Sequence, residues 1–251
     1  MLEFKNVTAG YGGKTALRID SLSLPAGQIT AVIGVNGSGK STLLKTAVGI
    51  VPHRGEIRID DTDVSALSCK ARARRIAYLP QTLTAPDMDA YTLVSHGRYA
   101  RLGRSKTLSA ADRDSIEAAM RLTGTWEMRD KFLKRLSGGE RQSVYLAMAI
   151  AQDTQMLLLD EPDTYLDVPH QLKIHTILRQ LADDGKGIVT VSHDIAKSFS
   201  QSDRICILSQ GKAAACDTPA VLSTDDRLYA ALGVRVAKTN GNTLYDYALT
   251  L

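Results

Sequence analysis

The sequence is poor in the features that mark secreted, membrane-spanning and metal-clustered proteins. Its only cysteines are Cys69, Cys206 and Cys216, and no two form a CxxC pair. We therefore expect neither a disulfide framework nor a cysteine metal site, and a reducing compartment. The longest apolar run, Val144 to Ala151, is far shorter than the ~20 residues that cross a membrane. The first residues show no basic-then-apolar leader, so we do not expect secretion.

Charge and composition exclude several classes of protein. The chain has 251 residues with 31 Lys and Arg against 27 Asp and Glu, a net charge of +4. This mild excess permits contact with an acidic surface without requiring nucleic acid, and we expect no nucleic-acid partner. Hydrophobic residues make up 44% and charged residues 23%, the mix of a folded globular protein. Disorder and collagen-like repeats are excluded.

The hydrophobic pattern predicts an α/β fold. Near-alternating apolar residues from Leu2 to Val7 and from Leu17 to Leu24 predict strands at the N-terminus. Continuous apolar runs typical of strands covered on both faces follow, with helical stretches between the later ones, which favours a parallel sheet. The strand-like runs lie at Ile29–Ile33, Glu56–Ile59, Ile76–Leu79, Met156–Leu159, Ile188–Val191 and Ile205–Leu208.

The middle of the chain has a different pattern. Residues 85–152 show little strand signal, a capping-box pattern at Ser109 and a second helix from about Glu140 to Gln152. We therefore expect an α/β core formed by residues 1–84 and 153–233, with residues 85–152 inserted as a helical subdomain. Residues 234–251 are expected to form a small strand-rich appendage.

A glycine-rich motif of the form GxxxxGK[ST] runs from Gly34 to Ser41, between a predicted strand and a helix from Lys40 to about Val48. Glycines let the backbone wrap closely and direct N–H groups inward, and the helix N-terminus favours negative charge. Lys40 can then reach the β- and γ-phosphates of a nucleotide, and Ser41 can bind Mg²⁺. The residues that we expect to hold the phosphates are Gly34, Asn36, Gly37, Ser38, Gly39, Lys40, Ser41 and Thr42.

Two adjacent acids, Asp160 and Glu161, directly follow the apolar run Met156–Leu159. Carboxylates at the end of a buried strand are costly unless a positive group meets them, and Mg²⁺ bound at Ser41 would be that group. We expect Asp160 to orient the metal ion. Glu161 would polarise the water that attacks the γ-phosphate, because phosphoryl transfer depends mostly on positioning and charge stabilisation.

A third motif narrows the class of nucleotide hydrolase. The segment Leu136-Ser137-Gly138-Gly139-Glu140-Arg141-Gln142 resembles the signature sequence of the ATP-binding cassette (ABC) family. The order of the motifs along nearly the whole chain fits too. The resemblance implies a P-loop NTPase core of the RecA-like type, with an N-terminal antiparallel β part and an inserted α-helical subdomain. It also implies ATP and Mg²⁺ as ligands.

The signature implies a head-to-tail pair of ATPase subunits, and we expect a homodimer. In the family, the signature of one copy closes over the ATP that the phosphate loop of the other copy holds. Ser137, Gly138, Gly139 and Glu140 would therefore contact the partner's nucleotide. From the residues alone, Ser-Gly-Gly also fits a plain helix-capping turn.

Further positions gain roles from the resemblance. Tyr11 resembles the aromatic residue that stacks on adenine, and Asp167 lies in what resembles the loop that signals between the two copies. Gln81 resembles the glutamine that touches Mg²⁺ and the attacking water. His193 resembles the histidine that contacts the γ-phosphate. The implied catalytic set is Glu161, His193, Gln81 and Lys40, and the implied metal set is Ser41, Gln81 and Asp160.

The sequence departs from the family pattern at three positions. Asp163 stands where threonine is usual, Ser143 where a second arginine is common, and Glu140 where glutamine is commoner. Asp163 adds a negative charge near the loop between the copies, and we expect it to tune hydrolysis or dimer closure without abolishing either.

Several short strings resemble ATPase subunits that import iron–siderophore complexes, haem and cobalamin. They are Val94–Arg98, Leu166–Gln171, Asp217–Pro219 and Tyr245–Tyr247. The resemblance implies an integral membrane permease as partner, an extracytoplasmic substrate-binding protein in the complex, and a peripheral position on the cytoplasmic face of the membrane. The permease would meet a surface near residues 82–91, where Leu83, Met88 and Leu93 either receive a partner helix or belong to the core.

Two other functions remain open. A soluble ABC-type ATPase acting on nucleic acid, the ribosome or a cofactor-assembly complex would usually carry two cassettes or a coiled coil, and neither pattern is present. A small-molecule kinase would leave the Ser-Gly-Gly signature unexplained. The basic run Lys70–Arg75 either faces anionic lipid headgroups or is a solvated face.

Overall fold

The computed structural model describes residues 1–103, 107–164, 166–238 and 245–249. Its main element is a six-stranded sheet of order β10-β9-β3-β8-β7-β6. Neighbouring strands from β9 to β6 are parallel, and β10 is antiparallel to β9. The strands are β3 (Ile29–Ile33), β6 (Ile76–Leu79), β7 (Met156–Asp160), β8 (Gly187–Val191), β9 (Arg204–Ser209) and β10 (Lys212–Asp217).

A second, antiparallel sheet of order β2-β1-β4-β5 is formed by the N-terminal part of the chain. It places β1 between β2 and β4, so the two alternating N-terminal segments pair as neighbours. A two-stranded antiparallel sheet lies near the C-terminus. The strands are β1 (Leu2–Tyr11), β2 (Lys14–Leu24), β4 (His53–Ile59), β5 (Thr62–Asp63), β11 (Val234–Lys238) and β12 (Tyr245–Leu249).

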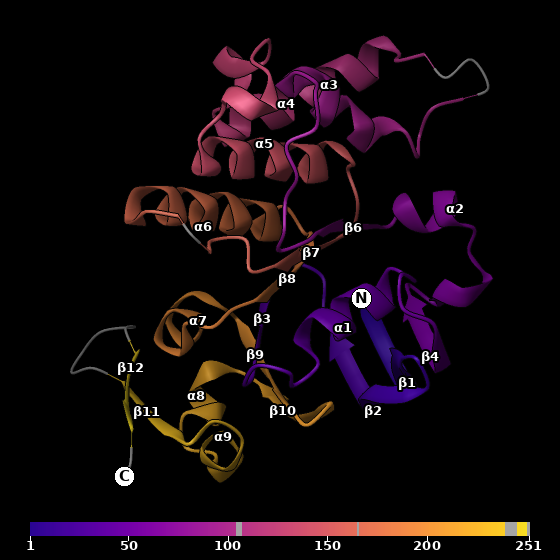
Figure 1. Ribbon diagram of the computed structural model, residues 1–251. Coiled ribbons are helices and arrows are strands. Elements are labelled where there is room, and N and C mark those ends of the chain that lie inside the picture. The colour runs from indigo at the N-terminus through magenta and orange to yellow at the C-terminus, as the bar shows by residue number, and fades with distance from the viewer. Residues whose placement is uncertain (104–106, 165, 239–244, 250–251) are drawn as a thin grey trace.

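The helices lie on both faces of the central sheet and at one end of the molecule (Figure 1). The α-helices are α1 (Lys40–Ala47), α2 (Cys69–Ala73), α3 (Ala90–Ser95), α4 (Ala110–Thr123), α5 (Gly138–Ala151), α6 (Val168–Asp183), α7 (Ile195–Gln201), α8 (Pro219–Leu222) and α9 (Asp226–Leu232). Short 3₁₀ turns are η1 (Val64–Ala66), η2 (His96–Arg98), η3 (Trp126–Met128) and η4 (Leu133–Arg135). None of the described helices combines the length and the apolar character that crossing a bilayer requires.

The central sheet separates two hydrophobic layers. Along β7, Leu158 packs with α1 and the N-terminal sheet, whereas Leu157 and Leu159 pack with α5 and α6. Successive side chains of a strand point to opposite faces, so a strand covered on both sides must be apolar throughout. Five of the predicted strand-like runs are therefore confirmed as strands of the central sheet, whereas Glu56–Ile59 lies in β4 of the antiparallel sheet. The predicted α/β class is confirmed with them.

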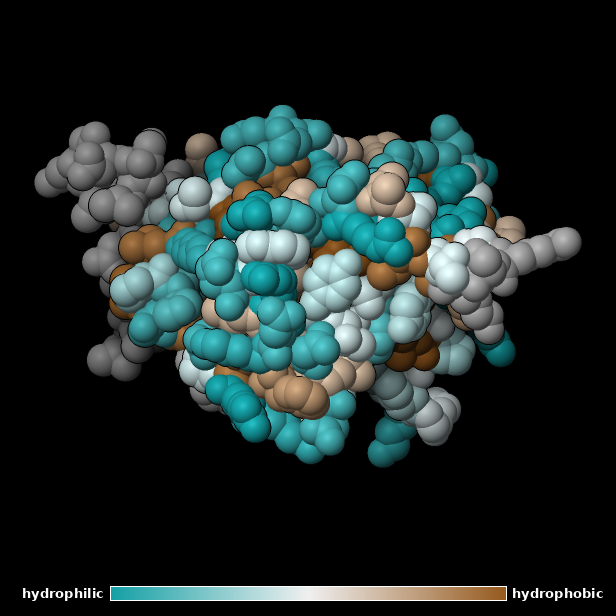
Figure 2. Space-filling view, turned by 90° about the horizontal axis from the view of Figure 1, so that it is seen from above, coloured by the Kyte–Doolittle hydropathy of each residue, from teal (hydrophilic) through white to brown (hydrophobic). Residues whose placement is uncertain are grey.

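Helices α3, α4 and α5 lie together above the sheet in Figure 1. Ser109 caps α4 through a reciprocal pair of bonds with Asp112, as the sequence pattern predicts. Leu93 is buried in the core, whereas Leu83 and Met88 are partly buried and pack against the same core. Figure 2 views this end from above, and mostly hydrophilic side chains cover it, with hydrophobic ones in small separate areas.

The basic run has a structural use that its composition does not reveal. Lys70 Nζ of α2 donates to the carbonyl oxygen of Leu102 at 2.6 Å, and Nε of Arg74, directly after α2, donates to that of Ala100 at 2.7 Å. Arg72 donates to two further carbonyl oxygens. The bonds of Lys70 and Arg74 join this region to the segment that follows α3, whereas those of Arg72 reach Val48 and Leu67.

Candidate active site

The glycine-rich loop connects β3 to α1 at the carboxyl edge of the central sheet. Gly37 and Gly39 have positive φ angles of 78° and 103°, a region that favours glycine. A Cβ atom on Gly34 would lie 2.3 Å from the carbonyl oxygen of Leu208, so only glycine fits there. The loop therefore takes the tightly wound path that its sequence predicts.

Lys40 is the first residue of α1 and is 6% exposed. Its ammonium group donates to the carbonyl oxygens of Gly34 at 2.7 Å and Val35 at 3.2 Å. Burial lowers the pKa of Lys40, and the nearby carboxylates of Glu161 and Asp160 oppose this shift. The lysine is thus held over the loop beside the acidic pair.

Other polar groups of the loop are also placed for a phosphate ligand. Ser38 Oγ is buried and has no hydrogen-bond partner among the described residues. Thr42 is buried in α1, and the side chain of Asn36 is exposed at the tip of the loop. An unpaired buried hydroxyl beside a helix N-terminus fits an anion, because a ligand oxygen would satisfy it.

Asp160 ends β7 and is 2% exposed. Its carboxylate accepts hydrogen bonds from Ser41 Oγ at 3.0 Å and from the hydroxyl of Tyr78 at 3.3 Å. Burial raises the pKa of Asp160, and these two bonds oppose the rise. The structure therefore joins the serine of the phosphate loop to the acid of β7, although 119 positions separate them in the chain.

Glu161 has the most constrained geometry in the site. It is 8% exposed and has a φ of +53°, a region that non-glycine residues rarely occupy. Its carboxylate accepts hydrogen bonds from Gln81 Nε2 at 2.7 Å and Thr164 Oγ1 at 3.1 Å, and it bonds His193 Nε2. Strained backbone held by several partners is a recognised mark of functional sites.

The signature segment forms the start of α5. Ser137 and Glu140 cap the helix reciprocally, with distances of 2.8 Å and 3.2 Å. The helix begins at Gly138, two residues before the predicted start, because Ser137 is the capping residue. Gln142 donates to the carbonyl oxygen of Pro162 at 2.8 Å, so α5 contacts the loop that carries Glu161.

Two further candidates, Asp167 and Tyr11, lie outside the cluster of hydrogen bonds around Glu161. Asp167 caps α6 and bonds His170, which lowers the pKa of Asp167. Tyr11 ends β1, and its side chain is 52% exposed. Within the described part of the chain, Ser137 bonds Glu140 and not the cluster around Glu161, and Tyr11 lies at the exposed end of β1.

Three contributors to the site were not singled out from the sequence: Tyr78, Thr164 and Gln142. Thr164 lies three residues after Glu161, and this short spacing was an available signal. Tyr78 and Gln142 contact residues far away in the chain, and no local pattern points to such pairs.

The fold and the site define a P-loop nucleotide hydrolase. A glycine-rich loop joins a central strand to a helix, and a carboxylate from another strand of the same sheet meets its serine at 3.0 Å. This is the arrangement that phosphate binding and metal-assisted phosphoryl transfer require.

Comparison with known proteins identifies the family. The ABC transporter family model matches residues 17–164. An iron(3+)-hydroxamate import ATP-binding protein from Bacillus subtilis (strain 168) is 38% identical over 90% of this chain and 86% of its own length. A ferric enterobactin transport ATP-binding protein from Escherichia coli (strain K12) is 34% identical over 93% of this chain and 88% of its own length.

A solved structure of an ATP-binding cassette, dimeric and bound to ADP and Pi after hydrolysis, is also similar. It has a TM-score of 0.77 and 27% identity, and the match covers 87% of this chain and 99% of that one. The chain belongs to the ABC transporter family. It is an ATP-binding subunit and an ATPase. The expected P-loop NTPase fold is confirmed, and a soluble ABC-type ATPase outside transport is not favoured.

Proposed function

We propose that this ATPase powers the import of a metal-chelate cargo, namely an iron–siderophore complex, haem or a cobalamin-type molecule. The relatives described above carry iron(3+)-hydroxamate and ferric enterobactin in their names, and they align over most of this chain. The subunit would act from the cytoplasmic face on an integral membrane permease, with an extracytoplasmic substrate-binding protein delivering the cargo. Co-purification of a permease in detergent and loss of metal-chelate uptake on gene deletion would test this. Normal uptake of iron–siderophore complexes, haem and cobalamin in the deletion strain would contradict it.

The arrangement of Glu161 carries the catalytic part of the proposal. Its carboxylate is fixed by Gln81, Thr164 and His193 beside the phosphate loop. In this position Glu161 polarises the attacking water, while His193 contacts the γ-phosphate and orients Glu161. Lys40 binds the β- and γ-phosphates, exchanging its present carbonyl partners for phosphate oxygens.

The remaining loop positions have binding roles in this proposal. The backbone N–H groups and hydroxyls of the loop hold the phosphates, and Tyr11 stacks on adenine. These phosphate-binding residues are Gly34, Asn36, Gly37, Ser38, Gly39, Ser41 and Thr42.

The donor set around Ser41 fits Mg²⁺. Ser41 Oγ and the Asp160 carboxylate lie 3.0 Å apart, and Gln81 bonds Glu161, the residue that follows Asp160. Among the residues that the structure describes, no group of three or more His, Cys, Asp or Glu side chains could hold a metal ion. Mg²⁺ commonly uses one or two protein oxygens together with substrate phosphates, so this sparse set suits it. When bound, Mg²⁺ neutralises charge that develops on the phosphate oxygens.

The signature residues act in this proposal on the nucleotide of a second copy. Ser137, Gly138 and Gly139 stand at the N-terminus of α5, where backbone N–H groups attract phosphate, and Glu140 fixes that end through its capping bonds. Asp167 caps α6 in the loop expected to signal between copies. The dimeric state of the related cassette supports a dimer of this subunit, and the proposed arrangement is a head-to-tail homodimer.

The subdomain boundaries belong to the same proposal. Residues 1–84 and 153–233 form the nucleotide-binding core, and residues 85–152 form the helical subdomain that carries the signature. Residues 234–251 form the C-terminal appendage, of which residues 239–244 and 250–251 lie outside the described part.

Two substitutions test the catalytic assignment. Glu161→Gln keeps the hydrogen-bonding shape and removes the charge, so kcat should fall by about 100-fold or more while ATP affinity stays within about threefold. Lys40→Ala should weaken ATP binding by about tenfold or more, because a charged partner of the phosphates is lost. Glu117→Gln, on the exposed face of α4, is the matched control. Unchanged hydrolysis by Glu161→Gln would remove the role given to Glu161.

A further inference from the structure

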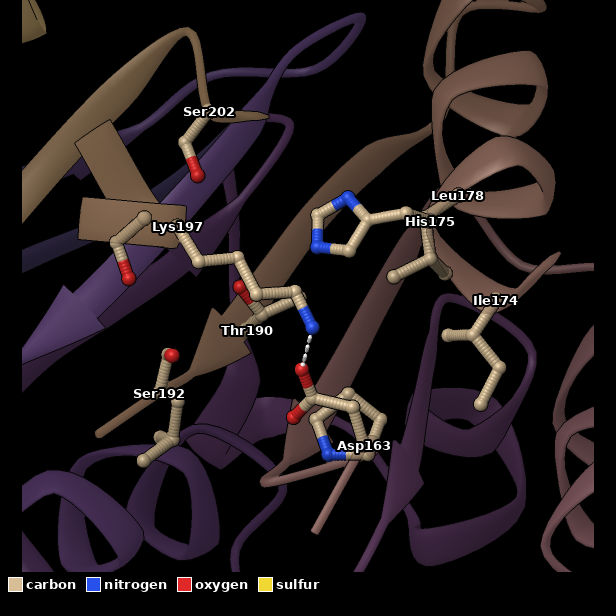
Figure 3. A pocket seen from close by; sticks show the side chains of 11 residues that line it. Asp163, Ile174, His175, Leu178, Thr190, Ser192, Lys197 and Ser202 are labelled. Atoms are coloured by element: carbon tan, nitrogen blue, oxygen red, sulfur yellow. Dashed lines mark hydrogen bonds and ion pairs between the residues drawn. The ribbon is translucent and has the colours of Figure 1, made fainter. Parts of the chain in front are cut away.

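An ion pair lies directly behind the Glu161–His193 contact. Asp163 follows Glu161 by two residues, and its carboxylate bonds Lys197 Nζ of α7. The two side chains are only 19% and 14% exposed. Lys197 also donates to Gln171 Oε1 of α6 at 3.2 Å. Figure 3 shows the lysine reaching across to the aspartate, with the dashed line joining them.

This pair connects the loop that carries Glu161 to α7, the helix that directly follows the loop of His193. Glu161 and Asp163 lie in the loop after β7, whereas His193 and Lys197 lie after β8, the adjacent parallel strand. The Glu161–His193 bond is one link between the loops, and the Asp163–Lys197 bond is a second link a few residues beyond it. Two links between short loops restrict their relative movement more than one link does, because rotation about the first is blocked.

Among the described residues, the cavity behind the Asp163–Lys197 pair offers neither side chain an alternative charged partner. This small cavity is lined by apolar Ile174 and Leu178, by several hydroxyl groups and by His175 (Figure 3). Burial first and the Lys197 charge second lower the pKa of His175 to about 4, so this imidazole is neutral at pH 7. A buried charge that loses its partner is strongly destabilised, and Asp163 is the carboxylate that faces Lys197.

We propose that Asp163 and Lys197 are positioning residues that keep the loops of Glu161 and His193 at a fixed separation. The two catalytic side chains then act as one unit. This inference rests on the roles proposed for Glu161 and His193. It also gives the departure of Asp163 from the usual threonine a physical purpose, because the aspartate supplies the charge that Lys197 requires.

A set of variants in the full-length chain tests the pair by steady-state ATP hydrolysis. Asp163→Asn and Lys197→Met should each lower kcat by about 10- to 100-fold, the cost of misplacing catalytic groups by roughly 1 Å, with KM and Kd for ATP within about twofold. Lys197→Arg retains the charge and should stay within about threefold of the wild type. The double variant Asp163→Asn/Lys197→Met should lose no more than the worse single variant, because one interaction is lost in all three.

Amide hydrogen exchange supplies a readout independent of turnover. Residues 161–164 and 192–197 should exchange faster in Asp163→Asn and in Lys197→Met, and at the wild-type rate in Lys197→Arg. The control Arg179→Met removes the ion pairs that Arg179 of α6 forms with Asp183 and Asp203. It should leave hydrogen exchange in both segments and kcat unchanged.

Unaltered exchange in both segments, or a kcat equal to that of the wild type in Asp163→Asn, would overturn the positioning role. A rise in the KM for ATP at constant kcat in Asp163→Asn and Lys197→Met would also overturn it. The failure of the proposed function is distinguishable. In that case Glu161→Gln itself would hydrolyse ATP normally, whereas failure of the pair alone would leave Glu161→Gln inactive and Asp163→Asn active.

Discussion

Replacement of Arg98 by methionine should destabilise the helical part of the protein by a predictable amount. Arg98 is 7% exposed at η2, and its guanidinium joins three segments. It donates to the Asp112 carboxylate of α4 at 2.8 Å and to the carbonyl oxygen of Ala151, the last residue of α5, at 2.8 Å. Methionine fills much of the same volume, so the variant removes these bonds without opening a large cavity.

The magnitude follows from the burial of both partners. Removing one member of a buried ion pair leaves the other charge uncompensated and costs about 3–5 kcal/mol. Ser109 still donates to Asp112 in the variant and offsets part of this loss, so we expect a decrease of about 3 kcal/mol in the free energy of unfolding. At about 2–4 °C per kcal/mol for a chain of this size, the melting temperature should fall by about 6–12 °C.

Urea denaturation followed by circular dichroism measures this change, with Glu117→Gln as the control. Glu117 pairs with Arg121 on the exposed face of α4, and such a pair contributes about 0.5 kcal/mol or less. If the free energy of unfolding of Arg98→Met were within about 1 kcal/mol of the wild-type value, the stabilising role given to the bonds of Arg98 would be refuted.

Two further predictions concern the loop and pH. Gly34→Ala places a Cβ atom 2.3 Å from the Leu208 carbonyl oxygen and should abolish ATP binding in a titration; wild-type affinity would contradict the tight loop path. Hydrogen bonds from Ser109, with help from Arg98, lower the pKa of Asp112 from 3.8 to about 2. The stability that Asp112 contributes is therefore complete above pH 3.8 and is lost as the pH falls toward 2. In urea titrations the difference in the free energy of unfolding between wild type and Asp112→Asn should be constant above pH 3.8 and should decrease as the pH falls toward 2. A difference that does not depend on pH would contradict the assignment.

Local pattern was sufficient to predict most elements of the fold. Apolar runs bounded by turn residues predicted Ile29–Ile33 and Ile76–Leu79 with the bounds that the structure shows. Burial on both sides of the central sheet leaves an unbroken apolar pattern, and glycine and lysine spacing defines the phosphate loop. These signals are short-range, so the sequence displays them directly.

Contacts between distant residues were not predictable from local pattern. Asp163 and Lys197 are 34 positions apart, and Arg98 and Ala151 are 53 apart. Each pairing depends on how helices and strands pack against one another, and the spacing of residues along the chain does not reveal this packing. The interpretation of residues 70–75 as a solvated or lipid-facing surface missed their carbonyl partners for the same reason.

The central claim is that two copies share each nucleotide, one through its phosphate loop and the other through its signature. A crystal structure of Glu161→Gln with ATP and Mg²⁺ tests it most directly, because this variant should retain the unhydrolysed ligand. We expect a head-to-tail dimer in which residues 137–139 of one copy contact the γ-phosphate held by Lys40 of the other. An ATP molecule bound at Lys40 with residues 137–139 of the second copy facing solvent would contradict it.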